Sequence, residues 1–224
     1  MARAVLSVLI VLFLVSGLRA NGLPVLRTIA EITRLTPEEA KLGYPVELSG
    51  MVVTFSKPEI ATLFIHDGSQ GIFVSRPLLP GDAGPVQGDH VDVSGFTEPG
   101  NFAASIKGKD REGAVVRVTG HGPMIEPKKV YGAELGMPGR DCDWVSVEAQ
   151  VIEVTIRYGD IVVECQSGTF PFFILLKGPL AERSVPWGLA EKKIRARGVV
   201  ASSFNSVRQM TRRFLRVSTL SEIE

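Results

Sequence analysis

The chain has 224 residues, 45% hydrophobic and 22% charged, a balance that is typical of globular proteins and excludes a disordered or fibrous one. Its 25 basic and 24 acidic side chains nearly cancel, which excludes the overall basic field that drives sequence-independent nucleic-acid binding. Two cysteines are too few for a disulfide-built scaffold or a structural zinc cluster. The 23 glycines and 14 prolines indicate many turns and favour β structure over long helices.

Residues 1–20 have the pattern of a secretory signal. A positive start at Arg3 is followed by an apolar run from Ala4 to Leu18, which is shorter than the about 20 residues that a bilayer-spanning helix needs. Ala20 suits the position before a cleavage site. We expect a cleaved signal peptide, with an uncleaved membrane anchor as the alternative, and a periplasmic or secreted protein. Without Arg3 and Arg19 the chain carries 23 basic and 24 acidic side chains, a net charge of −1.

The rest of the chain repeats itself once. Val46–Val52 and Val145–Val151 both alternate apolar and polar residues, as half-buried strands do, and they lie 99 residues apart. Further strand-like pairs are Gly71–Val74 with Phe170–Ile174, Gly88–Gly95 with Glu191–Gly198, and Ala114–Val118 with Arg213–Thr219. This repetition predicts two copies of one small β domain, at residues 21–127 and 128–224.

Each copy begins with helical material. In the first copy, Thr36–Glu39 has the pattern of a capped helix start with a proline at the first helical position, and Gly43 ends the helix. Val130–Leu135 is the weaker equivalent in the second copy. Long proline-containing inserts, Pro77–Gly88 and Gly178–Gly188, separate the third and fourth strands.

Five short antiparallel strands with a longer third connection are typical of a small closed barrel of the OB type. A β-sandwich, the alternative, needs about seven strands per domain. The predicted fold class is therefore all-β with short helices, built as two tandem OB-like five-stranded barrels.

Seven segments carry a resemblance to a known family: Ile29–Ile32, Leu35–Ala40, Val46–Thr54, Leu63–Val74, Gly198–Val200, Phe204–Thr211 and Val217–Glu224. With these segments the sequence resembles the periplasmic tandem OB-like region that precedes bacterial sensor histidine kinases. The resemblance implies a ligand-sensing module of a two-component system, without naming a ligand. No kinase part follows in this chain, so a free-standing exported relative and a piece of a longer sensor remain alternatives.

No motif for catalysis, for a phosphate loop or for a metal site occurs, so we expect no enzyme activity, cofactor or metal. His66 stands beside Asp67, but a turn aspartate that caps its own backbone is the simpler interpretation. His90 is expected to face solvent beside Asp92, and His121 lies near the domain junction.

A disulfide between the two cysteines is not expected. A hairpin turn at Arg157–Asp160 places Cys165 opposite about residue 152, and Cys142 lies about ten residues further along the strand, or about 33 Å. Bridged Cα atoms lie within about 7 Å of each other.

A group of basic residues in the second copy is the candidate ligand site. Ile194 and Ala196 alternate with Arg195 and Arg197, and Leu215 and Val217 alternate with further polar positions. If the apolar residues point inward and the two strands pair, the outward side chains form one cationic patch around an aromatic ring, suited to phosphates, carboxylates or stacked bases. Its members are Lys193, Arg195, Arg197, Arg212, Phe214 and Arg216. A solvated polar face is the alternative.

The connection Ser202–Gln209 adds Phe204, Asn205 and Arg208 to the candidate site, because OB folds bind through this loop. Phe102 occupies the equivalent place in the first copy, so a packing role for both phenylalanines is an alternative.

Together these features predict an exported, monomeric, non-enzymatic binding or sensing module. Its partners would be an unidentified small or anionic ligand and, in the sensing interpretation, a membrane-bound signalling protein. The alternative is a single-stranded nucleic-acid-binding OB protein, or an accessory of a nuclease, against which the net charge of −1 argues.

Overall fold

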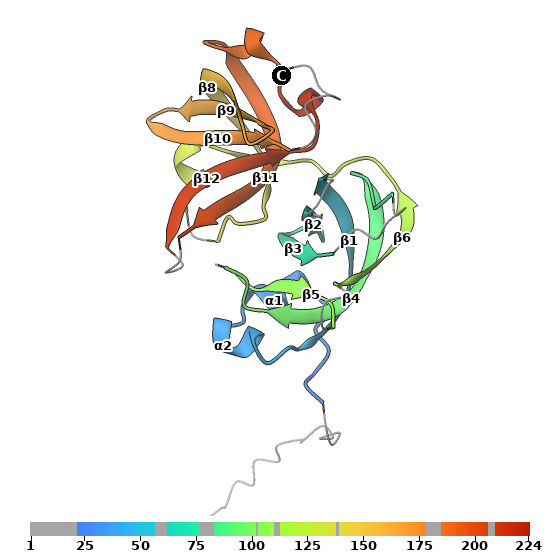
Figure 1. Cartoon of the computed structure of the whole chain (residues 1–224). Helices are drawn as coiled ribbons and strands as arrows, with labels where there is room; N and C mark the ends of the chain where they lie inside the picture. Colours follow the sequence, from blue (N-terminus) through green and yellow to red (C-terminus); the bar gives the residue numbers. More distant parts are fainter. Residues whose placement is uncertain are drawn as a thin grey trace, which may run out of the picture.

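The computed structural model describes residues 22–56, 62–76, 83–101, 103–109, 113–137, 139–177, 185–205 and 209–224. The predicted signal segment, Phe102, Arg208 and much of both predicted inserts lie outside the described residues. Figure 1 shows two barrels, the first formed by β1–β6 and the second by β7–β12.

The first barrel closes through a pairing between its first and fourth strands. The order is β1-β2-β3-β5-β4, and β4 pairs again with β1. β3 and β5 are parallel, and the other pairs are antiparallel. The strands are β1 (Pro45–Ser56), β2 (Thr62–His66), β3 (Gly71–Ser75), β4 (Asp89–Glu98), β5 (Ser105–Lys107) and β6 (Val115–His121).

The second barrel repeats this topology. Its order is β8-β9-β10-β12-β11, closed by β11 on β8, with β10 parallel to β12. A short strand, β7 (Lys128–Val130), runs parallel to β8. The others are β8 (Trp144–Arg157), β9 (Asp160–Ser167), β10 (Phe170–Leu176), β11 (Lys193–Phe204) and β12 (Met210–Val217). Both barrels therefore have the OB topology, and the predicted fold class is confirmed.

The fifth strand of the first barrel differs from the prediction, which placed it at Ala114–Val118. The structure divides it into β5, which pairs in parallel with β3, and β6, which continues along β4. The division occurs between Gly108 and Gly113, whose backbones lie so close that a Cβ on Gly108 would be 1.5 Å from the Gly113 carbonyl oxygen. Only the second piece has enough alternating residues to be visible in the sequence.

Short helices begin each half. In α2 (Pro37–Ala40), Thr36 and Glu39 exchange the predicted capping hydrogen bonds, and Gly43 follows with a φ of 73°. The sequence analysis did not assign α1 (Ile29–Thr33), which Thr28 caps in the same way. In the second half, α3 (Gly132–Leu135) is shorter than predicted, because Val130 belongs to β7. The described residues also include the 3₁₀ turns η2 (Trp187–Leu189) and η3 (Leu220–Glu222).

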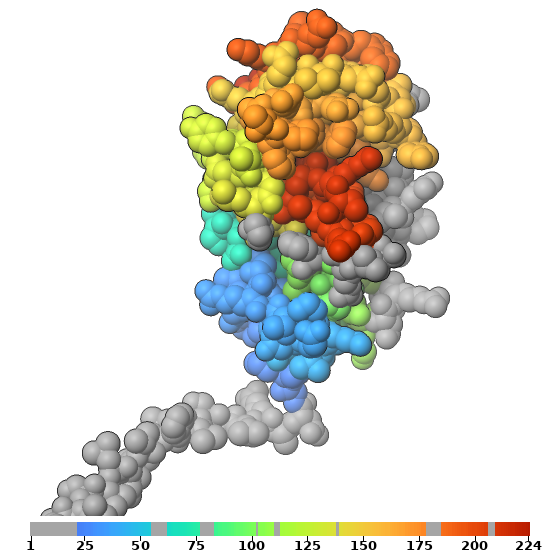
Figure 2. Space-filling view, turned by 90° about the vertical axis from the view of Figure 1, so that its left-hand side faces the viewer, coloured from blue at the N-terminus to red at the C-terminus, as the bar shows by residue number. Residues whose placement is uncertain are grey.

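Each barrel has its own apolar core, and a third apolar cluster joins the two. Val53 and Phe64 of the first barrel pack in this cluster with Trp144, Val199 and Ala201 of the second. In Figure 2, the red residues of the last strand lie where the orange second barrel meets the first. In the described part of the chain, no helix is long and apolar enough to cross a membrane.

Candidate functional site

The structure confirms which side chains of β11 and β12 point inward. Ile194, Ala196, Leu215 and Val217 are buried in the second core. The residues that alternate with them are exposed or half-buried, among them Arg195, Arg197, Arg212, Phe214 and Arg216.

The prediction that these arginines form one cluster is wrong, because only the second half of β11 pairs with β12. Arg216 lies opposite Val199, and Arg212 lies opposite Ser203. The first half of β11 pairs with β8 instead. Arg195 there forms an ion pair with Glu148 (3.1 Å), and Arg197 forms one with Glu224. These two arginines therefore form a separate, neutralised group.

A second group of cations lies around Phe173, on the outer surface of β10. The guanidinium carbon of Arg212 lies 5.5 Å from the centroid of this ring, and that of Arg157 lies 6.0 Å from it. We call Arg157, Phe173 and Arg212 the basic–aromatic face. The sequence analysis missed Phe173 and Arg157, although the alternation of buried Phe172 and Ile174 was a signal that Phe173 points outward.

Tyr158 extends from the turn beside this face. It occupies the first central position of the β8–β9 hairpin, with a φ of 54°, and Gly159 follows with a φ of 82°. Its side chain is fully exposed. A tyrosine in this left-handed conformation costs free energy, and its ring is available to a ligand.

A cleft of about 580 Å³ lies between the barrels and includes three of the predicted site residues, Phe204, Phe214 and Arg216. The first barrel contributes Phe64 and Phe73, whose ring centroids lie 5.5 Å apart at 59°. The name interbarrel cleft is used below for the space lined by these five residues together with Thr62, 98–101, 103–105, Asp141, Cys142 and 200–202.

Among the described residues that line the interbarrel cleft, Arg216 is the cation. Its guanidinium carbon lies 5.6 Å from the centroid of Phe214. Its buried Nε has no hydrogen-bond partner, and among the described residues no carboxylate forms an ion pair with it. Burial lowers the pKa of Arg216, and the charge of Asp160 opposes this shift.

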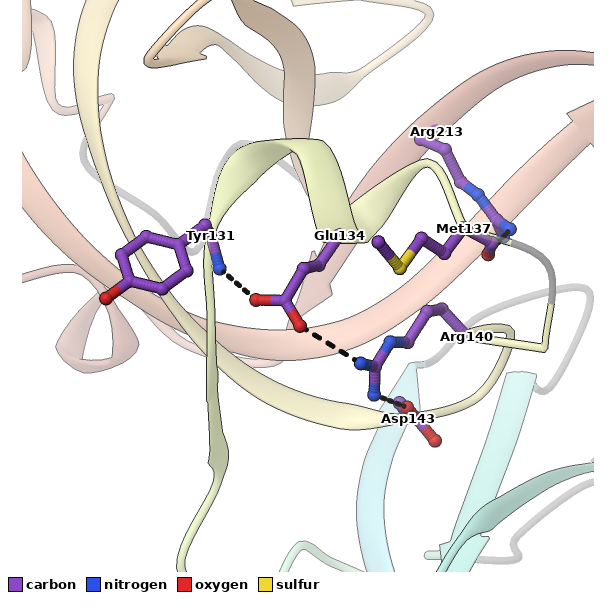
Figure 3. Close-up of polar contacts among 6 residues, drawn as sticks. All are labelled: Tyr131, Glu134, Met137, Arg140, Asp143 and Arg213. Carbon is purple, nitrogen blue, oxygen red and sulfur yellow. Dashed lines mark hydrogen bonds and ion pairs between the residues drawn. The ribbon is translucent and has the colours of Figure 1, made fainter.

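A buried ion pair supports the wall on the side of the second barrel. Arg213 points inward in the middle of β12 and bonds Asp141 at 2.6 Å, the Met137 carbonyl at 3.0 Å, and Ser202. Figure 3 shows the segment that carries these partners: Arg140 bonds Glu134 and Asp143, each at 3.2 Å. The position of Asp141 in the cleft is therefore fixed by contacts on both sides of it.

The remaining predicted loop residues have different surroundings. Phe204 is half-buried at the end of β11, where it lines the interbarrel cleft. Asn205 is exposed, and it closes the loop by exchanging hydrogen bonds with Gln209 at 3.0 and 2.9 Å. Arg208 lies outside the described residues.

The histidines follow their predicted interpretations. The carboxylate of Asp67 accepts hydrogen bonds from the backbone of Ser69 and Gln70, so it caps its own turn. His66 is buried, its Nδ1 accepts from the Gly68 N–H, and burial lowers its pKa. His90 is exposed, as predicted. Within the described ranges, no three or more metal-binding side chains come together.

The cysteines also follow the predicted register. Cys165 lies opposite Val151, within one residue of the predicted position. Cys142 and Cys165 are both free thiols, and burial raises the pKa of each.

No protein-family profile and no curated protein sequence matches this chain. Among solved structures, it is similar to an aspartyl-tRNA synthetase from Entamoeba histolytica, with 16% identity and a TM-score of 0.33 over 42% of this chain. The chain spans 20% of the length of that enzyme. It is also similar to the p204 HINb domain, with 15% identity and a TM-score of 0.35 over 75% of this chain and 91% of that domain.

A third similar structure is the Ifi202 HINa domain in complex with 20-bp double-stranded DNA, with 9% identity and a TM-score of 0.38 over 77% of this chain and 91% of that one. At these TM-scores, the assignment of the two barrels rests on their own strand order and pairing.

Proposed function

We propose that the protein is a non-enzymatic binding protein that holds single-stranded nucleic acid on the basic–aromatic face of its second barrel. The observation that carries this proposal is the contact of two guanidinium groups, those of Arg157 and Arg212, with the ring of Phe173. Aromatic rings stack with bases of any sequence, and neighbouring cations bind the backbone phosphates. A base that stacks on Phe173 would displace a guanidinium and leave it beside a phosphate.

The position of this face within the barrel supports the proposal. OB barrels bind oligonucleotides on their second and third strands and on the loops that follow the first and fourth strands. Phe173 lies on the third strand of the second barrel, and Arg157 ends the first strand. Arg212 lies close to the loop between the fourth and fifth strands. The overall charge is near zero, so the attraction has to be local.

The acidic residues nearby would restrict the path of a bound nucleic acid across the barrel. Glu164 lies opposite Phe173 on β9, and Glu153 lies opposite Glu164 on β8. Phosphates would be repelled from that side of Phe173. A nucleic-acid strand would therefore run over β10 and β12, toward the first barrel.

Export and the sensing role remain predictions. The signal-like segment lies outside the described residues, and the resemblance to periplasmic sensor regions rests on the sequence motifs alone. Both are compatible with a binding module, and we retain export as part of the proposal.

The proposal is tested by the fluorescence anisotropy of a labelled single-stranded oligonucleotide at several salt concentrations. F173A should weaken binding by about 1–3 kcal/mol, the typical value of one base–aromatic stack. R157Q/R212Q should reduce the slope of log K against log[salt] by about 1.4, because each phosphate contact with a single strand contributes about 0.7.

The matched control is R195Q/R197Q, which removes the same number of charges from the ion-paired group. It should leave the affinity and the salt slope nearly unchanged. If the control weakens binding as much as R157Q/R212Q does, or if the oligonucleotide does not bind at all, the basic–aromatic face is not a nucleic-acid site.

A further inference from the structure

We infer that the interbarrel cleft binds a single nucleotide, with its base between the aromatic rings and its phosphate on Arg216. The choice of a nucleotide rests on the proposed function, because the nucleotide would be either the end of a strand bound on the basic–aromatic face or a free mononucleotide. Both sources share one chemistry, a planar heteroaromatic ring that carries an anionic group.

The size and lining of the cleft suit such a ligand. Its volume of about 580 Å³ falls within the range of about 300–1,000 Å³ that is usual for small-molecule sites. Phe64 and Phe73 come from the first barrel, and Phe204 and Phe214 come from the second. Aromatic rings on two walls offer faces and edges to a flat ring.

Arg216 is the group in the cleft that would bind an anion. Among its described lining residues, Asp141 is neutralised by its ion pair with Arg213, whereas Glu98, whose carboxylate accepts a hydrogen bond from Ser105, keeps its negative charge. In the described residues, Arg216 has a cation–π contact and a buried, unpartnered Nε, but no ion pair. Burial of a charge without an ion pair is unfavourable, so a phosphate that accepts hydrogen bonds from the guanidinium where it lines the cleft would bind strongly there.

The cleft is continuous with the basic–aromatic face. Phe214, in its wall, lies beside Phe173 in the parallel pair of β12 with β10. Adjacent strands are about 4.8 Å apart, so a chain that crosses from Phe173 toward the first barrel reaches Phe214 and Arg216 next. The two sites use different side chains and can be tested separately.

Trp144 provides a local reporter for the cleft. It is buried, and it packs in the cluster that also contains Phe73 and Phe214. The chain has two tryptophans, and the other, Trp187, is 57% exposed. In W187F, the remaining tryptophan emission reports on Trp144 alone.

The experiment titrates W187F with AMP, with adenosine, and with an oligoadenylate that does or does not carry a terminal phosphate, and follows Trp144 emission together with calorimetry. AMP should bind at least tenfold more tightly than adenosine. In W187F/R216M, which keeps an unbranched apolar stem but lacks the guanidinium group, this preference for the phosphate should disappear. The matched variant W187F/R195Q/R197Q, which removes charges from the ion-paired group outside both sites, should bind AMP as W187F does.

The outcomes separate the two proposals and the two sources. If AMP binds no better than adenosine, or if R216M keeps the preference, the inference is overturned, and this holds whether or not oligonucleotides bind the basic–aromatic face. If AMP requires Arg216 but R157Q/R212Q has no effect on oligonucleotides, the cleft stands as a mononucleotide site and the proposed function fails. A terminal phosphate that tightens oligonucleotide binding only when Arg216 is present identifies the strand end as the source.

If R216M unfolds, R216K keeps the charge but loses the planar, forked geometry, and it should bind AMP more weakly than W187F alone. The comparison of AMP with adenosine in W187F needs no change in the cleft, so folding defects in the variants cannot hide the result.

Discussion

Removal of the Arg213 side chain should destabilise the protein far more than removal of an exposed arginine. The side chain of Arg213 is 3% exposed, and that of its partner Asp141 is 11% exposed. In R213M, the apolar length of the side chain is kept, but Asp141, Ser202 and the Met137 carbonyl lose their donor. When one partner of a buried ion pair is removed, the remaining charge is left without compensation, which costs about 3–5 kcal/mol.

The control is R195Q, which breaks the ion pair with Glu148, whose side chains are 51% and 77% exposed. Pairs of this kind contribute about 0–1 kcal/mol. Urea unfolding of the full chain measures both changes through the free energy of unfolding extrapolated to water. The reasoning is refuted if R213M and R195Q differ by less than about 1 kcal/mol.

A double variant identifies the cause of the loss. R213M/D141L replaces both charges by apolar groups, a change that is often close to neutral for a buried pair. It should therefore recover part of the stability that R213M loses. If the double variant is as unstable as R213M, the lost hydrogen bonds to Ser202 and Met137 are responsible, and the unpaired carboxylate is not.

Three further predictions concern titration and the exposed hairpin. Burial raises the pKa of Glu222, which accepts a hydrogen bond from Gln87 across the barrels. The contribution of Glu222 to stability is therefore complete below about pH 4.5 and is lost as the pH rises through its raised pKa. E222Q should flatten this part of the profile of Tm against pH. Burial lowers the pKa of His66, so stability should fall as the pH drops below about 6.5 and through its lowered pKa, and H66Q should show a smaller fall over the same range. Y158G should stabilise the protein by about 1 kcal/mol in urea unfolding, because glycine tolerates the positive φ. The same variant should bind oligonucleotide more weakly in the anisotropy assay. An unchanged affinity would show that the ring of Tyr158 contacts no base.

Local patterns explain which parts of the fold could be predicted. The alternation in Val46–Val52, the capping residues of α2 and the Arg157–Asp160 turn depend on neighbours a few residues apart, and all three appear in the structure. The three residues of β5 are too few to show a period. Their role depends on a parallel contact between Val74 and Ile106, which no local pattern indicates.

The candidate site was only partly predictable, because its contacts are distant in the sequence. Strand parity correctly gave the outward direction of Arg212 and Arg216, but the pairing offset between β11 and β12 decides which cations become neighbours. The bond from Arg213 to Asp141 spans 72 positions. The interbarrel cleft additionally depends on how two separate barrels pack, and the sequence of neither copy contains that information.

The packing between the barrels leads to a final prediction about residues 21–127 and 128–224 expressed separately. Each half retains its own core, and each has about 100 residues, enough to fold without cross-links. Separation would expose Trp144, Val199 and Ala201 of the second half, which are at most 8% exposed in the full chain. Each large apolar side chain that is exposed again costs about 1.5–3 kcal/mol. The second half should therefore unfold cooperatively but at a lower temperature than the full chain, and its Trp144 emission should shift to longer wavelength. A second half without cooperative unfolding would show either that the boundary at residue 127 is wrong or that the second barrel needs the first to remain folded, whereas an unshifted emission would show that the two barrels are not packed together in solution.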